Sequence, residues 1–214
     1  MLAQSISRNG VLLAIFAVVT TAVVAVTYLS TKSRIDDNIR AAEASALLEI
    51  VPHSRHNNSM VDDKVPVDDS PLLGLREARS MYFARQNGKL VAVILPVTAR
   101  DGYSGDIHLI VGVNADGSVA GVRVLSHQET PGLGDNVDYS KSHWVDEFID
   151  KSLATVGIDR WAVKKDGGVF DQFTGATITP RAVTKAVKQA LEYFAQHRAE
   201  WWPEQQQRVA TQGK

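Results

Sequence analysis

The sequence of 214 residues contains no cysteine. Disulfides, thiolate metal ligands, iron–sulfur ligation and a cysteine nucleophile in this chain are therefore excluded. Neither sign of charge is in excess, since 23 Lys and Arg stand against 24 Asp and Glu and the formal net charge is −1. A basic face of the kind that binds nucleic acid is not expected, and we predict no nucleic-acid partner.

The glycine motifs of common nucleotide-binding folds are missing as well. The run "TGAT" at 174–177 does not match G-x-x-x-x-G-K-[S/T], which argues against nucleotide hydrolysis. The run "GLGDNV" at 132–137 does not complete G-x-G-x-x-G, so a Rossmann domain is disfavoured. His53 and His56 lie near several aspartates, but no coordination geometry is fixed there. We predict a solvated loop, no metal site and no catalytic side chain.

One long apolar run is present, "VLLAIFAVVTTAVVAVTYL" at residues 11–29, and it carries no charge. Its length suits the roughly 20 residues that a helix needs to cross a bilayer. We interpret residues 1–30 as an N-terminal tail and a transmembrane helix. A cleaved signal peptide is the alternative, but its apolar core would be shorter, roughly 7–15 residues, and no A-x-A-like site follows.

The charges around this run bear on its orientation. Arg8 precedes it, whereas Lys32, Arg34 and Arg40 follow it. The positive-inside rule alone would leave the large domain in the cytoplasm, but few charges are counted and long domains translocate largely regardless of charge.

Residues 31–80 are expected to form a helical stalk and a linker. Apolar residues recur at helical spacing after the span, and the charged, proline-bearing stretch 53–71 is typical of a linker or an exposed excursion.

Residues 81–198 are expected to form one domain that begins with two β-hairpins. Asn87-Gly88 separates the first pair of apolar stretches, and Asp116-Gly117 lies between the second pair. A further short strand is expected at 161–165. Strands first and helices later describe an α+β domain, with an antiparallel sheet covered by helices.

Two helices are expected after the hairpins. Ser142 is positioned to cap a helix within 140–153, whose predicted apolar face comprises Trp144, Val145, Phe148 and Ile149. The last long helix, within 181–198, has a continuous apolar stripe that should cover the sheet. Residues 199–214 are expected to form a mobile tail, in which Trp201 and Trp202 either pack on the domain or rest at a membrane surface.

The last helix has an opening that suits an anion. Thr179 followed by Pro180 predicts a capped first turn. A helix N-terminus offers unpaired N–H groups and positive dipole charge, which favour a phosphate. From spacing alone, a plain capped helix after a glycine turn is the favoured interpretation of these residues.

The stretch "DQFTGAT" at 171–177 resembles the flavinylation motif of FMN-binding domains, D-x-x-[S/T]-G-A-[T/S]. The resemblance implies that Thr177 carries FMN through a phosphoester. It also implies that the other motif positions serve the modification or hold the phosphate; these are Asp171, Thr174, Gly175 and Ala176.

Two further stretches resemble the same domain, "DGYSGDIHLIVGV" from residue 101 and "SHQETPGLGD" at 126–135. The second implies a loop beside the flavin ring, formed by Glu129, Thr130, Gly132, Leu133 and Gly134.

With its single span, the chain is similar to the G subunits of Rnf/Rsx-type ion-translocating electron transport complexes. This resemblance implies an electron-transfer subunit in the bacterial inner membrane, with the large domain on the periplasmic side. It implies other membrane and peripheral subunits as partners, and a dedicated FAD-dependent flavin transferase that attaches the FMN.

Three alternatives remain open at the level of sequence. The C subunits of sodium-translocating NADH:quinone reductases share the domain and the anchor, although they are longer. A membrane-tethered interaction or assembly module would need no cofactor. A self-sufficient flavin reductase would turn over soluble donor and acceptor without partner subunits.

Overall fold

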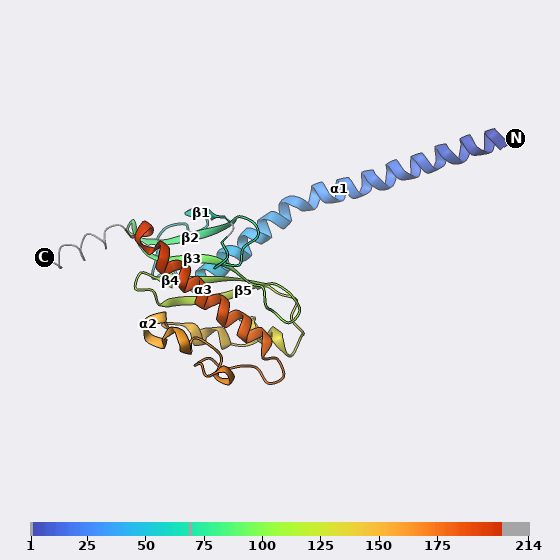
Figure 1. Ribbon diagram of the computed structural model, residues 1–214. Helices are drawn as coiled ribbons and strands as arrows, with labels where there is room; N and C mark the ends of the chain where they lie inside the picture. The colour runs from blue at the N-terminus through green and yellow to red at the C-terminus, as the bar shows by residue number, and fades with distance from the viewer. Residues whose placement is uncertain (1, 69, 203–214) are drawn as a thin grey trace. The chain divides into compact units, whose positions relative to one another are not determined.

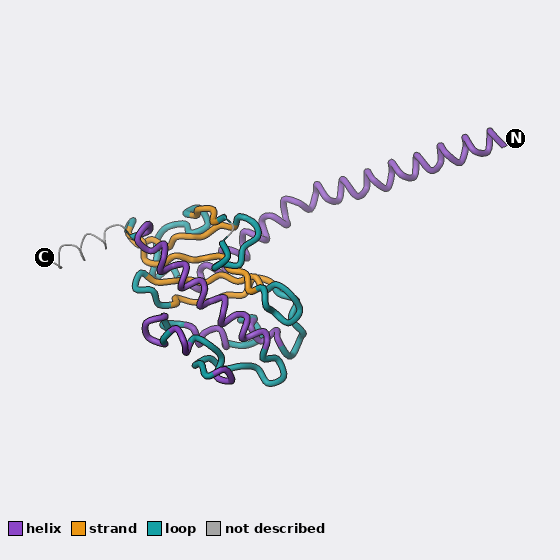
Figure 2. The backbone as a smooth tube through the Cα atoms, viewed as in Figure 1, coloured by secondary structure: helices purple, strands orange, loops and turns teal. Residues whose placement is uncertain are grey.

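The computed structural model describes residues 2–68 and 70–202 (Figure 1). The chain divides into two compact units at Glu43, and the second unit begins at Ala44. Helix α1 (Leu2–Ile50) makes up the first unit and contributes its last residues to the second. Figure 2 shows the strands, the helices and the long loops of the second unit.

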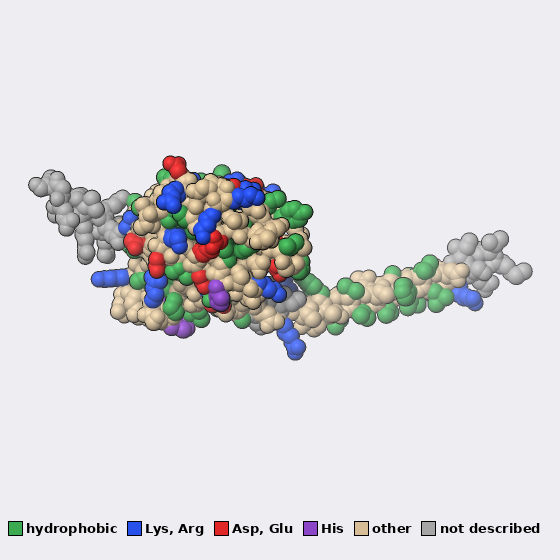
Figure 3. All heavy atoms as spheres, turned by 90° about the horizontal axis from the view of Figure 1, so that it is seen from below, with side chains coloured by type: hydrophobic (Ala, Val, Ile, Leu, Met, Phe, Trp, Pro, Cys, Tyr) green, Lys and Arg blue, Asp and Glu red, His purple; other side chains and the backbone are tan. Residues whose placement is uncertain are grey.

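The first unit contains a helical segment, Arg8–Lys32, that is long and apolar enough to cross a membrane. It includes the predicted span at 11–29. Its large apolar side chains are exposed, and hydrophobic side chains are spread along α1 in Figure 3. The hydroxyls of Thr20 and Thr27 donate to the carbonyls of Phe16 and Val23 at 2.9 and 2.8 Å. Back-bonding of this kind makes threonine compatible with an apolar helix.

The second unit is built on one antiparallel sheet of five strands in sequential order. The strands are β1 (Lys64–Val67), β2 (Arg79–Gln86), β3 (Lys89–Ala99), β4 (Ile107–Asn114) and β5 (Val119–Ser126). Both predicted hairpins are confirmed, because β2 pairs with β3 across Asn87-Gly88 and β4 pairs with β5 across the 114–118 turn.

Strand β1 was not predicted, and the interpretation of 53–71 as a linker or exposed excursion is wrong for part of that stretch. Val65 and Val67 favour extended structure, and Pro66 is tolerated because β1 is an edge strand. His56, expected in a solvated loop, is buried, and its Nδ1 lies 3.1 Å from the Pro52 carbonyl oxygen.

Helix α3 (Ile178–Trp201) covers one face of the sheet, as the apolar stripe predicted. Figure 1 shows it lying across the strands. The buried residues of the stripe are Ala182, Val183, Ala186, Val187, Ala190, Leu191 and Phe194. Beyond α3, Trp202 is buried and its Nε1 donates to the Leu90 carbonyl at 3.0 Å, so the end of α3 packs on the domain. The remainder of the predicted mobile tail, 203–214, lies outside the described residues.

The end of α1 packs on the sheet as well. Leu47, Ile50 and Val51 form a second buried cluster with sheet residues such as Tyr82 and Ile94. The sheet is therefore buried on both faces, and the unit has the predicted α+β class.

The segment between β5 and α3 is less regular than the sequence predicts. In place of one helix within 140–153 there are a 3-10 helix, η2 (Trp144–Phe148), and a short helix, α2 (Leu153–Val156). Ser142 does not cap an α-helix; its Oγ accepts from the Trp144 N–H at 3.2 Å. The helix cannot continue because the N–H of Asp150 and the carbonyl of Lys151 pair with the Val119 backbone.

The strand predicted at 161–165 is also wrong. Val163 makes a single bridge with Phe170, and η4 (Lys164–Asp166) follows it. Two further 3-10 turns are present, η1 (Gly134–Val137) and η3 (Ile158–Arg160).

A buried arginine joins three parts of this unit. Arg123 on β5 is 7% exposed, and its Nε donates to Glu49 Oε2 at 2.7 Å. Its Nη1 lies 3.7 Å from Asp146 Oδ1, and its guanidinium carbon lies 3.6 Å from the centre of the Tyr139 ring. The end of α1, the sheet and the 139–146 segment thus share one cation.

Arg123→Ala should lower the free energy of unfolding by about 2–4 kcal/mol, since a desolvated cation–π contact and charged hydrogen bonds are lost together. Thermal unfolding of the full chain in detergent, followed by near-ultraviolet circular dichroism, would measure it. Arg160→Ala, which removes an exposed arginine on η3, is the matched control. Equal melting temperatures for the two variants would contradict this role of Arg123.

Candidate functional site

The loop after β5 is shaped by a β-turn over Thr130, Pro131, Gly132 and Leu133. The Leu133 N–H donates to the Thr130 carbonyl at 3.1 Å. Proline at the second position and a glycine of positive φ (77°) at the third are what a type II turn requires. The turn leads into η1, so the residues of the loop itself fix its conformation.

Glu129, just before this turn, is buried at 4% exposure. Its Oε1 accepts from the Ser104 N–H at 2.8 Å, and its Oε2 accepts from the Thr179 hydroxyl. The Glu129 N–H donates to His127 Nδ1 at 3.1 Å. One carboxylate therefore connects the 102–106 loop, the 129–134 loop and the first turn of α3, three segments far apart in the sequence.

Gly134 makes this arrangement sterically possible. A Cβ at that position would lie 2.7 Å from both Glu129 Oε2 and Thr179 Oγ1. Any side chain there would force the carboxylate and the hydroxyl apart.

The stretch before α3 forms a second tight turn. The Ala176 N–H donates to the Phe173 carbonyl at 3.2 Å, and Gly175 has a φ of 81° at the third position of the turn. Glycine fits this conformation without strain. The turn ends at Thr177, which occupies the N-cap position of α3.

The prediction that Thr179 caps the helix, with Pro180 at its first position, is wrong. The helix starts at Ile178, and Thr179 lies one position inside it, buried against Glu129. Thr177 is the N-cap residue, and within the described residues its hydroxyl makes no capping hydrogen bond. The Thr179 hydroxyl donates instead to the buried Glu129, fifty residues away. Local capping rules do not predict this contact.

These elements enclose a cavity of about 360 Å³. Seven predicted site residues line it, namely Glu129, Thr130, Leu133, Gly134, Gly175, Ala176 and Thr177. Three lining residues were not predicted, namely Tyr103, Ile178 and Thr179. Tyr103 belongs to a stretch whose resemblance was already noted, and the other two follow from the corrected start of α3.

Asp171, Thr174 and Gly132 do not line the cavity. Asp171 is exposed and forms an ion pair with Lys164, whose pKa is raised by the hydrogen bond that its ammonium group donates to Asp171. The Asp171 backbone is held by η2, because its carbonyl accepts from Trp144 Nε1 and its N–H donates to Glu147 Oε2, both at 2.9 Å. The Asp171 carboxylate therefore lies outside the cavity.

An ion pair braces the start of α3. Arg181 donates to Asp166 through Nε at 2.6 Å and through Nη2 at 2.5 Å, which lowers the pKa of Asp166. The 164–166 turn and the helix start are thereby held together.

The cavity has the chemistry that a flavin mononucleotide needs. In the described part of the chain, the N–H groups of Ile178 and Thr179 have no backbone acceptor, so they are donors for a phosphate at a helix N-terminus. Leu133, Ile178 and Tyr103 offer exposed apolar surface for a planar ring. The volume lies within the roughly 300–1,000 Å³ of small-molecule sites.

Comparison with known families agrees with this fit. Residues 102–192 match the FMN-binding domain, and residues 1–50 match the RnfG N-terminal region. The second unit therefore contains a domain of the FMN-binding class.

Curated relatives define the family more narrowly. The chain is 50% identical over 195 residues to the G subunit of the ion-translocating oxidoreductase complex of Pseudomonas aeruginosa, covering 91% of each chain. It is 47% identical to the protein of the same name from Vibrio atlanticus, over 91% of this chain and 92% of the relative. For Shewanella oneidensis the identity is 46%, over 90% and 91%. The chain belongs to the family of ion-translocating oxidoreductase complex G subunits.

Thr179→Val, which keeps the shape but removes the hydroxyl, should lower the free energy of unfolding by about 1–3 kcal/mol, since a buried carboxylate oxygen loses its donor. Thr179→Ser retains the hydroxyl and is the control. Melting temperatures of both variants, measured on the full chain in detergent, check this. If serine and valine destabilise equally, packing rather than the hydrogen bond to Glu129 matters.

Proposed function

We propose that this chain is an electron-transfer subunit that carries FMN covalently on Thr177, in a membrane complex that couples electron transfer to ion translocation. The observation that carries the proposal is the position of Thr177. This residue lines the cavity at the start of α3, and among the described residues its hydroxyl makes no capping hydrogen bond.

The start of α3 suits a phosphoester on Thr177. The N–H groups of Ile178 and Thr179 and the positive end of the helix dipole stabilise negative charge at this point. Thr177 supplies the ester oxygen, and the glycine turn before it keeps side chains away from the approaching group. Gly175 and Ala176 have small side chains or none, so they let the phosphate come close to the backbone.

The remaining cavity residues bind and orient the ring. Leu133 and Ile178 exclude water from it, and Tyr103 presents an exposed aromatic face. Thr130 contributes polar groups of the loop to the cavity wall, and Gly134 contributes backbone. When bound, FMN accepts and donates electrons, and hydrogen bonds and charge near its ring tune its potential.

Glu129 belongs to the loop expected beside the ring, and its carboxylate also has a role within the protein. Both of its carboxylate oxygens already accept hydrogen bonds from the protein. It acts as a positioning residue that holds the cavity walls in register, rather than as a hydrogen-bond partner of the ring.

The one carboxylate that lines the cavity, Glu129, already accepts hydrogen bonds at both oxygens, so we expect a second protein to form the ester. We infer that a FAD-dependent flavin transferase makes the bond, with AMP as leaving group. Asp171, Thr174 and Gly175 are exposed in the motif and are available to such an enzyme. The exposed Asp171 carboxylate fits recognition by the transferase better than a contact with phosphate.

We place the flavin domain on the periplasmic side of the inner membrane, anchored by the single apolar segment of α1. Covalent attachment has a physical use there, because an FMN that dissociates outside the cytoplasm is lost by dilution. The complex named for the relatives supplies the partner subunits. The match of residues 1–50 to the RnfG N-terminal region favours this assignment over the C subunit of a sodium-translocating NADH:quinone reductase.

The assignment predicts flavin fluorescence from the protein band on a denaturing gel after production in cells with a flavin transferase. Thr177→Ala should abolish the fluorescence, since the ester oxygen is gone, and Thr177→Ser should retain it. Equal staining of the three bands for protein is the control. Fluorescence that survives Thr177→Ala would refute attachment at this residue.

A further inference from the structure

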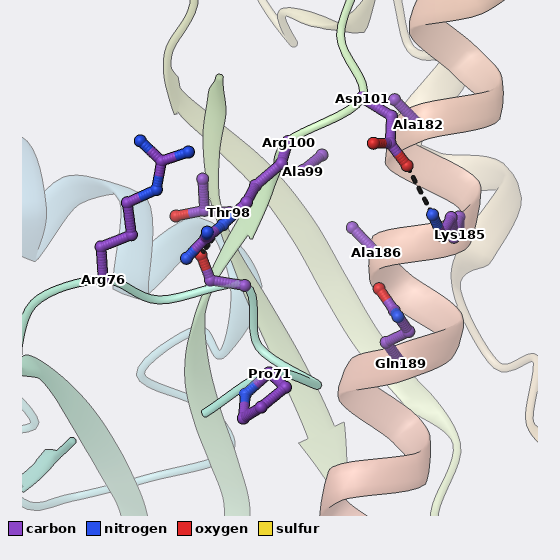
Figure 4. A pocket seen from close by; sticks show the side chains of 11 residues that line it. Pro71, Arg76, Thr98, Ala99, Arg100, Asp101, Ala182, Lys185, Ala186 and Gln189 are labelled. Carbon is purple, nitrogen blue, oxygen red and sulfur yellow. Dashed lines mark hydrogen bonds and ion pairs between the residues drawn. The ribbon is translucent and has the colours of Figure 1, made fainter. Parts of the chain in front are cut away.

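A second, larger pocket lies outside the FMN cavity. It has a volume of about 640 Å³ and is bounded by the loop at 71–76, the end of β3 and the middle of α3. Figure 4 shows Arg76 and Arg100 on one side of it, and Lys185 and Gln189 of α3 on the other. No residue that lines the FMN cavity also lines this pocket, so it is a separate feature of the surface.

The pocket carries an excess of positive charge. Arg76, Arg100 and Lys185 line it, and its one lining carboxylate, Asp101, is paired with Lys185. Arg100 donates through Nε to the Gly74 carbonyl at 2.7 Å, which fixes its stem and leaves the terminal nitrogens of its guanidinium for another acceptor. Within the described residues, neither Arg76 nor Arg100 forms an ion pair. The pocket therefore presents two guanidinium groups that no carboxylate of the described chain pairs with.

The positive charge continues along α3 toward the FMN cavity. A smaller hollow of about 260 Å³ shares Asp101, Ala182 and Lys185 with the pocket and is also lined by Arg181 and Ile178. Ile178 lines the FMN cavity too, so the two hollows lead up to its edge. The four cations that line these hollows form a basic strip, namely Arg76, Arg100, Arg181 and Lys185.

Exposed apolar side chains adjoin the basic strip at the FMN cavity. Tyr103, Leu133 and Ile178 line the cavity and are 69%, 43% and 45% exposed; we call these three the apolar rim. Protein interfaces are enriched in aromatic residues and arginine, and exposed apolar surface beside charged residues marks an interaction site. Electron-transfer partners meet over small contacts, for which a surface of this kind suffices.

The chemistry of the strip indicates what kind of group it binds. Guanidinium groups with free terminal nitrogens bind carboxylates through paired hydrogen bonds. An acidic loop of another protein supplies such carboxylates and also brings surface that buries the apolar rim, whereas a free anion would leave the rim exposed. Charge complementarity together with the rim therefore favours a protein partner with an acidic face.

We propose that the basic strip and the apolar rim form the surface on which another subunit of the complex docks through acidic side chains. This rests on the proposed function, since the docked subunit is the one that exchanges electrons with the FMN. Thr177 and Lys185 are eight positions apart, or about 12 Å along the helix axis. A partner on the strip thus brings its own electron carrier close to the flavin. Each electron that the FMN gives up reduces that carrier, and transfer in the other direction oxidises it.

Photo-cross-linking in the assembled complex tests the surface directly. Arg76→p-benzoylphenylalanine is introduced into the full chain, which is produced together with the other subunits, and the membranes are irradiated. We expect an adduct with one subunit of the complex, in a peptide that contains Asp or Glu. The same replacement at Arg160, an exposed arginine on η3 that lines neither hollow, should give no adduct with that subunit.

Four results of the cross-linking would overturn the docking surface. They are no subunit adduct at position 76, equal adducts at positions 76 and 160, an adduct with lipid alone, and a cross-linked peptide that lacks Asp and Glu.

Charge reversal measures what the strip contributes to electron transfer. In the complex purified in detergent, Arg76→Glu combined with Lys185→Glu should slow electron exchange between FMN and the partner's carrier about tenfold at low ionic strength, and less at high ionic strength, because salt screens the attraction. Stopped-flow absorbance of the flavin measures this rate. Arg160→Glu should leave the rate unchanged. Arg76→Gln, a milder change at an exposed side chain, repeats the test if the double variant melts at a lower temperature than the wild type.

A charge swap completes the test. Lysine in place of the carboxylates that cross-linking identifies should restore the rate in the double variant. Equal rates for the wild type and the double variant, or no recovery in the swapped pair, would contradict docking through these charges.

Flavin fluorescence on a denaturing gel separates failure of this inference from failure of the proposed function. The double variant should keep the wild-type fluorescence, because neither residue lines the FMN cavity. Loss of fluorescence there would show that the strip serves attachment of the flavin, and would overturn the docking role. Fluorescence without a cross-link at position 76 overturns the docking surface and leaves FMN on Thr177. A cross-link without covalent flavin in the wild type contradicts the proposed function and leaves the docking surface.

Discussion

The hydrogen bonds of the buried Glu129 carboxylate determine how the FMN cavity is assembled. They join the 102–106 loop to the first turn of α3, and Glu129 itself carries the loop at 129–134. A buried carboxylate is costly unless its oxygens are paired, so each of the two contacts supports the other. The missing side chain at Gly134 leaves the space that both partners occupy. The three walls of the cavity are thus preformed.

The rest of the unit presents the start of α3 to that cavity. The apolar stripe of α3 packs on the sheet, which fixes the helix axis, and the turn at 173–176 and the Arg181–Asp166 pair fix its first residues. The N–H groups of Ile178 and Thr179, which have no backbone acceptor among the described residues, therefore belong to residues that line the same cavity as Thr177. A phosphate at this position meets donors that are already oriented, so little ordering is needed on binding.

Local signals in the sequence predicted the regular parts of the fold. Asn87-Gly88 and Asp116-Gly117 mark the hairpins because their backbone preferences are intrinsic, and the stripe from Ala182 to Phe194 marks the buried face of α3. Strand β1 was missed because an edge strand of four residues has little pattern of its own. The helix at 140–153 was overestimated because Val119 recruits the backbone at 150–151, a contact that spacing within the segment does not reveal.

Contacts between residues distant in the sequence also explain why the sequence predicted only part of the candidate site. Resemblance placed Thr177 and its neighbours on the cavity, but the capping rule misassigned Thr179, whose hydroxyl donates to a residue fifty positions away. Glu129 was expected in a loop beside the ring; it lines the cavity, and sequence spacing gave no sign that both of its carboxylate oxygens accept hydrogen bonds within the protein. Tyr103 lies in a stretch that resembles the domain, but its spacing alone assigns its side chain no role. Residues whose partners are distant in sequence are the ones that spacing cannot assign.

The proposed function depends on the chemical state of one side chain. Mass spectrometry of the peptide that contains Thr177, from protein isolated out of its native membrane, tests this most directly. A covalent flavin subunit should yield a peptide that carries the added mass of FMN less water, with fragment ions that locate the mass on Thr177. An unmodified peptide at full occupancy, or the same mass on another residue, would contradict it.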